Sequence, residues 1–115
     1  MDNFDKGVWN RLYYEGQHIA AELQPRLPGC RRRWAAIYKA GPTHPLSPWG
    51  EATYKYSVLA FELSEDLVDE YFSEEDKQNQ VQIFAGSEAD LIGILREQAI
   101  DPSLFTYPWK CDYPL

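Results

Sequence analysis

Hydrophobic residues change their spacing between Thr53 and Phe72. Apolar and polar side chains first alternate and then form a continuous apolar run at residues 58–61, which is typical of a strand covered on both faces. From Ser64 the spacing becomes helical, and Ser64 offers an N-cap with carboxylates in the following turn. The pattern predicts a central strand that leads into a short helix over residues 64–72.

This predicted helix has one apolar and one acidic face, because residues three and four apart lie on the same side of a helix. The apolar face holds Leu67, Val68, Tyr71 and Phe72, and the acidic face holds Glu65, Asp66, Asp69 and Glu70.

A second helical pattern covers residues 5–24, where apolar side chains recur at the spacing of one helical face from Trp9 to Leu23. Pro25 would end this helix. Gly16 weakens it, so the segment either forms one helix, breaks into two, or uses the glycine for a close contact with another element.

Two further strands and one helix follow from local composition. Aromatic and β-branched residues predict a strand over residues 32–40, and residues 81–85 predict a third. Ser87 and Asp90 form a capping box at the start of a helix over residues 88–99, which Pro102 would stop. Between the first two strands, residues 41–50 contain three prolines and two glycines, which predicts a long loop.

The C-terminal segment places a large or apolar side chain at every second position, at Tyr107, Trp109, Cys111 and Tyr113. It could form a final edge strand, where Pro108 would be tolerated, or an extended arm that packs its aromatic rings onto the body. We expect these rings to be part of the core wall; the alternative is a binding surface, since Tyr and Trp are enriched at interfaces.

The order of these elements predicts a single α+β domain over residues 1–115 with a mostly antiparallel sheet of three or four strands. The order is helix, strand, strand, helix, strand, helix. The first two strands should pair antiparallel across the proline-rich loop. The aromatic tail could add a fourth strand at the edge.

Charge is unevenly distributed along the 115-residue chain, whose formal net charge is −7. Residues 62–76 contain eight acidic side chains and no basic one. Arg31, Arg32 and Arg33 precede Trp34 and could bind phosphates beside a stacked base. We instead expect alternate arginines to face opposite sides of the strand, one solvated and one paired with a carboxylate, because the acidic total disfavours nucleic-acid binding.

Catalytic and metal-binding patterns are lacking in the sequence. Cys30, Cys111, His18 and His44 show no metal-ligand spacing, and there is no calcium loop or phosphate-binding glycine motif. We expect no cofactor, no catalysis and two free thiols in a reducing cytoplasm, since no secretion signal or membrane-spanning run is present.

Two kinds of binding function remain. The first is a cytoplasmic protein that caps and neutralises a basic protein partner, a toxin or a nucleic-acid-binding protein; it is similar in size and charge, though in no motif, to small immunity proteins, antitoxins and phage-coded mimics of nucleic acid. The second is an interaction module that binds through the proline-rich loop or the tail. The candidate acidic residues are Glu62, Glu65, Asp66, Asp69, Glu70, Glu74, Glu75 and Asp76, and the candidate aromatic residues are Trp49, Tyr107, Trp109 and Tyr113.

Overall fold

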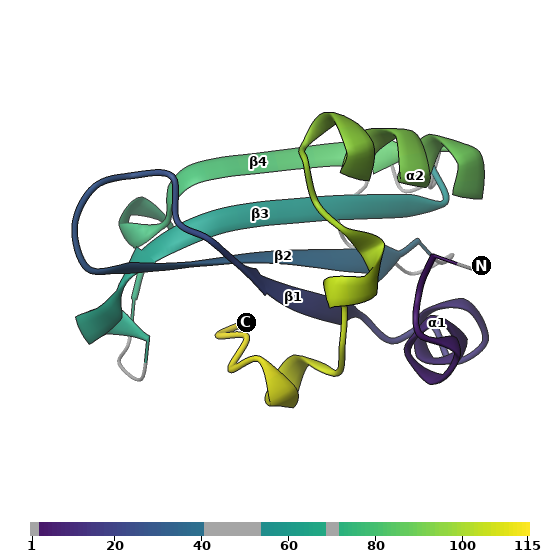
Figure 1. Ribbon diagram of the computed structural model, residues 1–115, viewed down its shortest axis with the longest axis horizontal. Helices are drawn as coiled ribbons and strands as arrows, with labels where there is room; N and C mark the ends of the chain where they lie inside the picture. The colour runs from purple at the N-terminus through teal and green to yellow at the C-terminus, as the bar shows by residue number, and fades with distance from the viewer. Residues whose placement is uncertain (1–2, 41–53, 69–71) are drawn as a thin grey trace.

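The sheet is a four-stranded antiparallel meander in which each strand pairs with the next one along the chain, in the order β1-β2-β3-β4. Figure 1 shows this computed structural model, which describes residues 3–40, 54–68 and 72–115. The elements are α1 (Lys6–Tyr13), β1 (Ile19–Leu23), β2 (Arg31–Lys39), β3 (Tyr56–Ser64), β4 (Gln78–Ala85) and α2 (Glu88–Glu97). The predicted α+β class with a mostly antiparallel sheet is confirmed.

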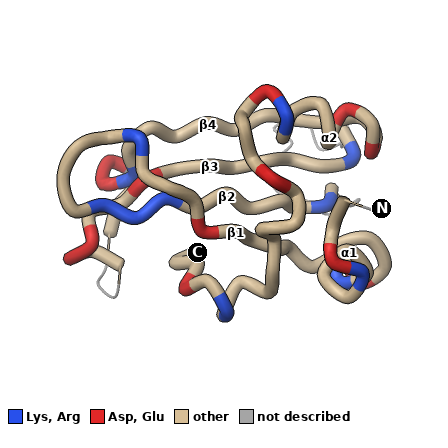
Figure 2. Tube along the Cα trace, viewed as in Figure 1, with Lys and Arg blue, Asp and Glu red and all other residues tan. Residues whose placement is uncertain are grey.

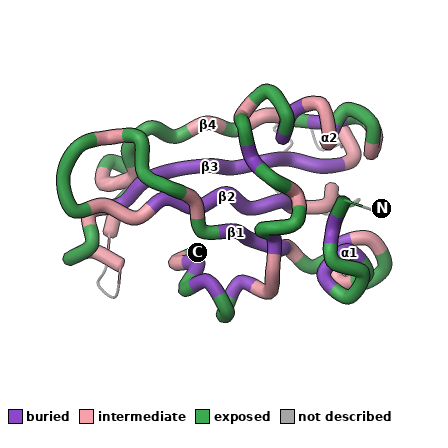
Figure 3. The backbone as a smooth tube through the Cα atoms, in the orientation of Figure 1, coloured by how far each residue is buried: buried purple, intermediate pink, exposed green. Residues whose placement is uncertain are grey.

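Both faces of the sheet carry a hydrophobic core, because successive side chains of a strand point to opposite faces. On the first face, alternate residues of β2 and β3 such as Ile37 and Val58 pack with side chains from α1 and α2. On the second face, Trp34, Phe61 and neighbouring apolar residues pack with the C-terminal segment. Strands β2 and β3 are consequently buried along most of their length, while β4 is mostly exposed (Figure 3).

The N-terminal helix is shorter than predicted. Asp5 caps α1 by accepting hydrogen bonds from the backbone N–H groups of Gly7 and Val8, each at 3.1 Å, and the helix ends at Tyr13. Gly16 adopts φ +67°, and residues 19–23 form β1 instead of helix. The expectation of one helix over residues 5–24 was wrong because Ile19, Ala20 and Ala21 are buried on both sides of a strand, and so short an apolar run fits either structure.

The helix expected at residues 64–72 is also not formed as predicted. Strand β3 continues to Ser64, which is paired with Arg31, and only a single 3₁₀ turn follows at Glu65–Leu67. The Ser64 hydroxyl donates to Asp66 at 2.7 Å and caps no backbone N–H group. Pairing with β2 therefore extends the strand past the expected helix start, and residues 69–71 lie outside the described residues.

The later elements agree better with the sequence. The side chain of Ser87 accepts a hydrogen bond from the Asp90 backbone N–H at 3.1 Å and caps α2, as expected. Strand β4 begins at Gln78, three residues before its predicted start. The proline-rich loop lies outside the described residues.

The C-terminal segment is an arm that packs on the body, with 3₁₀ turns at Pro102–Leu104 and Pro108–Lys110. It touches the outer edge of β1 at one bridge, where Thr106 and Ala20 exchange backbone hydrogen bonds of 2.8 and 3.1 Å. The indole Nε1 of Trp34 donates to the carbonyl of Cys111 at 2.7 Å. Of the two alternatives for the tail, the arm is therefore the one observed.

Candidate functional site

Exposed carboxylates gather at the end of the sheet where β2 begins. Glu65 and Asp66 are exposed in the 3₁₀ turn after β3, and Glu75 is exposed in the Glu74–Asp76 turn before β4. Figure 2 shows both turns at this same end. We call Glu65, Asp66, Glu75 and Asp76 the acidic end; Asp69, Glu70 and the side chain of Glu74 lie outside what the structure describes.

The carboxylates of the acidic end are free to meet a partner. Asp66 and Asp76 accept hydrogen bonds only from nearby serines, Ser64 and Ser73, and the Ser64 hydroxyl holds the pKa of Asp66 below its usual value. Within the described ranges, neither Glu65 nor Glu75 forms an ion pair. The Asp66 carboxylate therefore stays ionised at neutral pH.

Glu62 does not belong to this surface, although the sequence suggested that it did. Its side chain is fully buried and accepts hydrogen bonds from the backbone N–H groups of Arg26 and Leu27, both at 3.2 Å, and from Asn79 Nδ2 at 2.9 Å. Burial alone would raise the pKa of this carboxyl, but the three donors and the nearby charge of Arg33 lower it overall. Glu62 is thus an ionised structural group that fastens the β1–β2 connection to the sheet.

The aromatic candidates divide into one core residue and one surface pair. Tyr113 is buried, and its hydroxyl lies 2.6 Å from that of Tyr38. Trp109 is 65% exposed, stacks on Tyr107 with ring centroids 5.1 Å apart, and lies under the guanidinium of Arg11 at 5.1 Å. Only the Tyr107–Trp109 pair can therefore offer a surface, while Trp49 lies outside the described residues.

The three consecutive arginines of β2 have different environments. Arg32 forms two hydrogen bonds of 2.8 and 2.7 Å with the Glu22 carboxylate and a contact of 3.3 Å with Asp112, so its charge is neutralised. Arg31 and Arg33 point to the opposite face, as alternation requires. Arg33 is only 6% exposed, which the sequence did not suggest.

Arg31 and Arg33 line a hollow of about 810 Å³ between the β1–β2 connection, the start of β2 and the segment that follows α2. Its basic residues are Arg26, Arg31, Arg32 and Arg33; its carboxylates are Glu22 and Glu65; and its remaining lining is Leu23, Gln24, Pro25, Ala99 and Leu104. No motif in the sequence indicates this hollow, because its members come from four separate segments.

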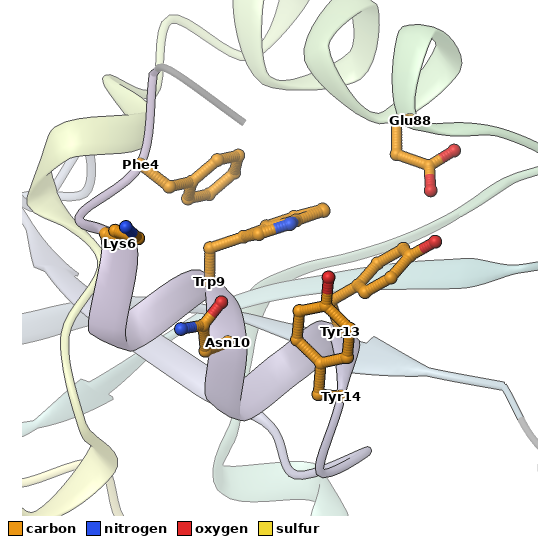
Figure 4. Close-up of a pocket in the computed structure, with 7 residues that line it drawn as sticks. All are labelled: Phe4, Lys6, Trp9, Asn10, Tyr13, Tyr14 and Glu88. Atoms are coloured by element: carbon orange, nitrogen blue, oxygen red, sulfur yellow. The ribbon is translucent and has the colours of Figure 1, made fainter.

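A second hollow, of about 730 Å³, lies between α1 and the start of α2 (Figure 4). Rings of Phe4, Trp9 and Tyr13 line it, and Glu88 lies at its far side. The Glu88 carboxylate is occupied by Lys55 Nζ at 2.5 Å and by the hydroxyl of Tyr56 at 3.1 Å. Lys6 also lines this hollow and forms no ion pair within the described ranges, so its charged groups are one free ammonium and one carboxylate that is already neutralised.

Metal ligands and membrane-spanning helices are the remaining features to consider in the described ranges. There, no group of three or more His, Cys, Asp or Glu side chains is placed to hold a metal ion. Neither α1 nor α2 is long and apolar enough to cross a membrane. Cys30 is exposed and Cys111 is buried, and both are free thiols.

No protein-family model, no curated protein and no solved structure matches this chain. Its function must therefore be argued from the surfaces described above.

Proposed function

We propose that this protein is a non-catalytic binding protein whose acidic end caps a basic protein partner. The observation that supports it best is the set of exposed carboxylates in the two turns at one end of the sheet, two of which have no ion pair among the described residues. Like charges held this close repel one another, and that repulsion opposes folding unless a cation is brought to them. A partner with a basic surface would relieve it.

The size of the chain and its net charge of −7 fit a protein that neutralises a toxin or a nucleic-acid-binding protein by covering its cationic site. Such a partner presents clustered lysine and arginine side chains for phosphates. The acidic end would occupy them in the place of nucleic acid.

The proposal is tested by capturing partners from the source cell with two double variants of equal net charge. Glu65→Lys with Glu75→Lys reverses two carboxylates of the acidic end. Glu15→Lys with Glu97→Lys reverses two exposed carboxylates near the ends of α1 and α2. We expect the first variant to lose a basic protein that both the wild type and the second variant retain.

Titration of the captured protein should then show affinity that falls steeply with salt, and an on-rate about tenfold or more lower for the first variant at low salt. If the two double variants captured the partner equally and associated with it at the same rate, the acidic end would matter only through the net charge of the protein. That result would contradict the proposal.

The exposed ring of Trp109, stacked on the half-buried Tyr107, favours a second candidate, an interaction module that binds through the tail. An aromatic hot spot of this kind typically contributes 2 kcal/mol or more to binding, roughly independent of salt. Trp109→Ala would then abolish capture while the Glu65 and Glu75 reversals would not. The same capture experiment therefore separates the two functions.

A further inference from the structure

Arg33 carries a buried positive charge without the partners that such a charge normally has. The residue is only 6% exposed, and its Nε atom has no hydrogen-bond partner. No described carboxylate lies within ion-pair distance of it. The nearest carboxylate in the sheet register, Glu62, gives its oxygens to Asn79 and to two backbone N–H groups. Burying a charge in this way is costly unless something pairs with it.

Two further guanidinium groups lie beside Arg33 without a carboxylate. Arg26 donates from Nη2 to the carbonyl of Gln98 at 2.9 Å, and Arg31 donates from Nε to the carbonyl of Pro28 at 3.0 Å. These bonds hold the two side chains in place and leave most of their N–H groups available. The positive charge of Arg26 is close enough to Arg33 to add to burial in lowering the pKa of Arg33.

The other charged groups around the hollow do not cancel this set. Glu22 is committed to Arg32. Glu62 accepts from three neutral donors, and its charge offsets that of Arg33 only in part. Glu65 also lines the hollow and has no ion pair among the described residues. The hollow therefore presents three guanidinium groups without a carboxylate in ion-pair contact against one free carboxylate, a lining of net positive charge that suits an anion.

We propose that this hollow binds a phosphate group carried by a small molecule with a short apolar part. The three arginines come from the β1–β2 connection and from two positions of β2, so they reach the hollow from different parts of the chain. A tetrahedral phosphate group has three free oxygens that can accept hydrogen bonds from three directions. A planar carboxylate instead suits two parallel N–H donors of a single guanidinium group. Leu23 and the half-exposed Leu104 supply the apolar wall.

This proposal is compatible with the net charge of −7, because it concerns one phosphate group and not a nucleic acid. A long polyanion meets the field of the whole surface. A small ligand inside a hollow is governed most by the nearest charges, and the lining holds four arginines against two carboxylates.

Phenyl phosphate and benzoate are suitable probes, since they share the ring and differ in the anion. Each is titrated into ¹⁵N-labelled protein at constant ionic strength while the side-chain Nε–H signals of the arginines are followed by NMR. We expect phenyl phosphate to shift the signals of Arg33 and Arg31 saturably and benzoate to leave them nearly unchanged. Inorganic phosphate should bind at the same site more weakly, because it lacks the apolar part.

Arg31→Gln should weaken phenyl phosphate binding by about tenfold or more, the usual effect of removing a hydrogen bond to a charged group. The matched control is Arg96→Gln, an exposed arginine of α2, which should bind like the wild type. Arg33→Gln should also weaken phenyl phosphate binding. If this variant fails to fold, the wild-type titration and Arg31→Gln still test the proposal.

Three outcomes would overturn the proposal. The first is no saturable shift of Arg33 with phenyl phosphate, and the second is an equal loss of affinity in Arg31→Gln and Arg96→Gln. The third is benzoate binding as tightly as phenyl phosphate, which would make the hollow a carboxylate site.

Discussion

Glu62 joins three parts of the chain through one carboxylate. It lies in β3 and receives hydrogen bonds from Asn79 in β4 and from the backbone of Arg26 and Leu27 in the β1–β2 connection. Removing the acceptor of a buried N–H group lowers the stability by more than the hydrogen bond itself contributes. The reason is that the donor then has neither its protein partner nor a water molecule to bond with. The position of the Arg26 side chain at the hollow therefore depends on Glu62.

The variant Glu62→Gln should destabilise the protein by about 1–3 kcal/mol, since the amide replaces one acceptor oxygen with a donor that faces other donors. Chemical denaturation at pH 7 measures this loss. The exposed control Glu97→Gln should change the free energy of unfolding by no more than about 0.5 kcal/mol.

The pH dependence of Glu62 has a defined sign. Its folded pKa lies below the unfolded value, so its contribution is present above about pH 4.3 and is lost as the pH falls through the folded pKa. The stability difference between the wild type and Glu62→Gln should shrink as the pH is lowered from about 5 to about 3. A difference that stays constant over this range would mean that the pKa of Glu62 is the same in the folded and the unfolded state.

The role of Glu62 could not be predicted from the sequence, in which it is one of eight acidic side chains in residues 62–76. Alternation along β3 places it on the same face as Val58 and Ala60, and that signal was available. What the sequence could not show is that the β1–β2 connection folds over this position. Arg33 was missed for the same reason.

Among the elements, those with a strong local signal were predictable. The apolar run of β3, the composition of β2 and the cap of α2 each determine their structure from neighbouring residues. Strand β1 was not predictable, because Ile19–Leu23 fits a helix face as well as a strand and only its pairing with β2 decides. The arm formed by residues 102–113 likewise depends on contacts with a completed sheet.

Two aromatic residues of the arm, Tyr113 and Trp109, differ in burial and should differ in their contribution to stability. We expect Tyr113→Ala to cost roughly 3–5 kcal/mol, because it removes a buried ring beside Phe61 and the partner of the Tyr38 hydroxyl. Trp109→Ala should cost about 1 kcal/mol or less, since that ring is mostly exposed.

Thermal and urea unfolding of the two variants against the wild type provide the measurement. If Trp109→Ala proved as destabilising as Tyr113→Ala, the exposed pair would be structural and the second candidate function would lose its basis.

At the scale of the whole molecule, folding mixes charges that the sequence keeps apart. Residues 1–57 carry a net positive charge and residues 58–115 a net negative one. Antiparallel pairing of β2 with β3 brings Arg31–Arg33 alongside Glu62 and Ser64, with Glu65 close behind. One end of the sheet therefore carries both the turns of the acidic end and the three arginines of β2 (Figure 2).

Salt should act on the stability of the free protein in the opposite direction to its effect on partner binding. Screening the repulsion of a chain with net charge −7 should raise the melting temperature by about 2–5 °C between low and moderate salt. The double variant Glu65→Lys with Glu75→Lys should show a smaller rise. An unchanged or falling melting temperature in the wild type would mean that attractive pairs such as Arg32–Glu22 outweigh the repulsion.

The position of the arm in the chain also sets the order in which the protein can be completed during synthesis. All four strands have been made once Ala85 is added, but Cys111 and Tyr113, which cover the second face over Trp34 and Phe61, follow about 25 residues later. At roughly 5–20 residues per second this leaves an interval on the order of one to five seconds. Throughout that time the nascent chain exposes an apolar sheet face. We expect chaperones to bind this face in the nascent chain and not in the mature protein, where the arm covers it.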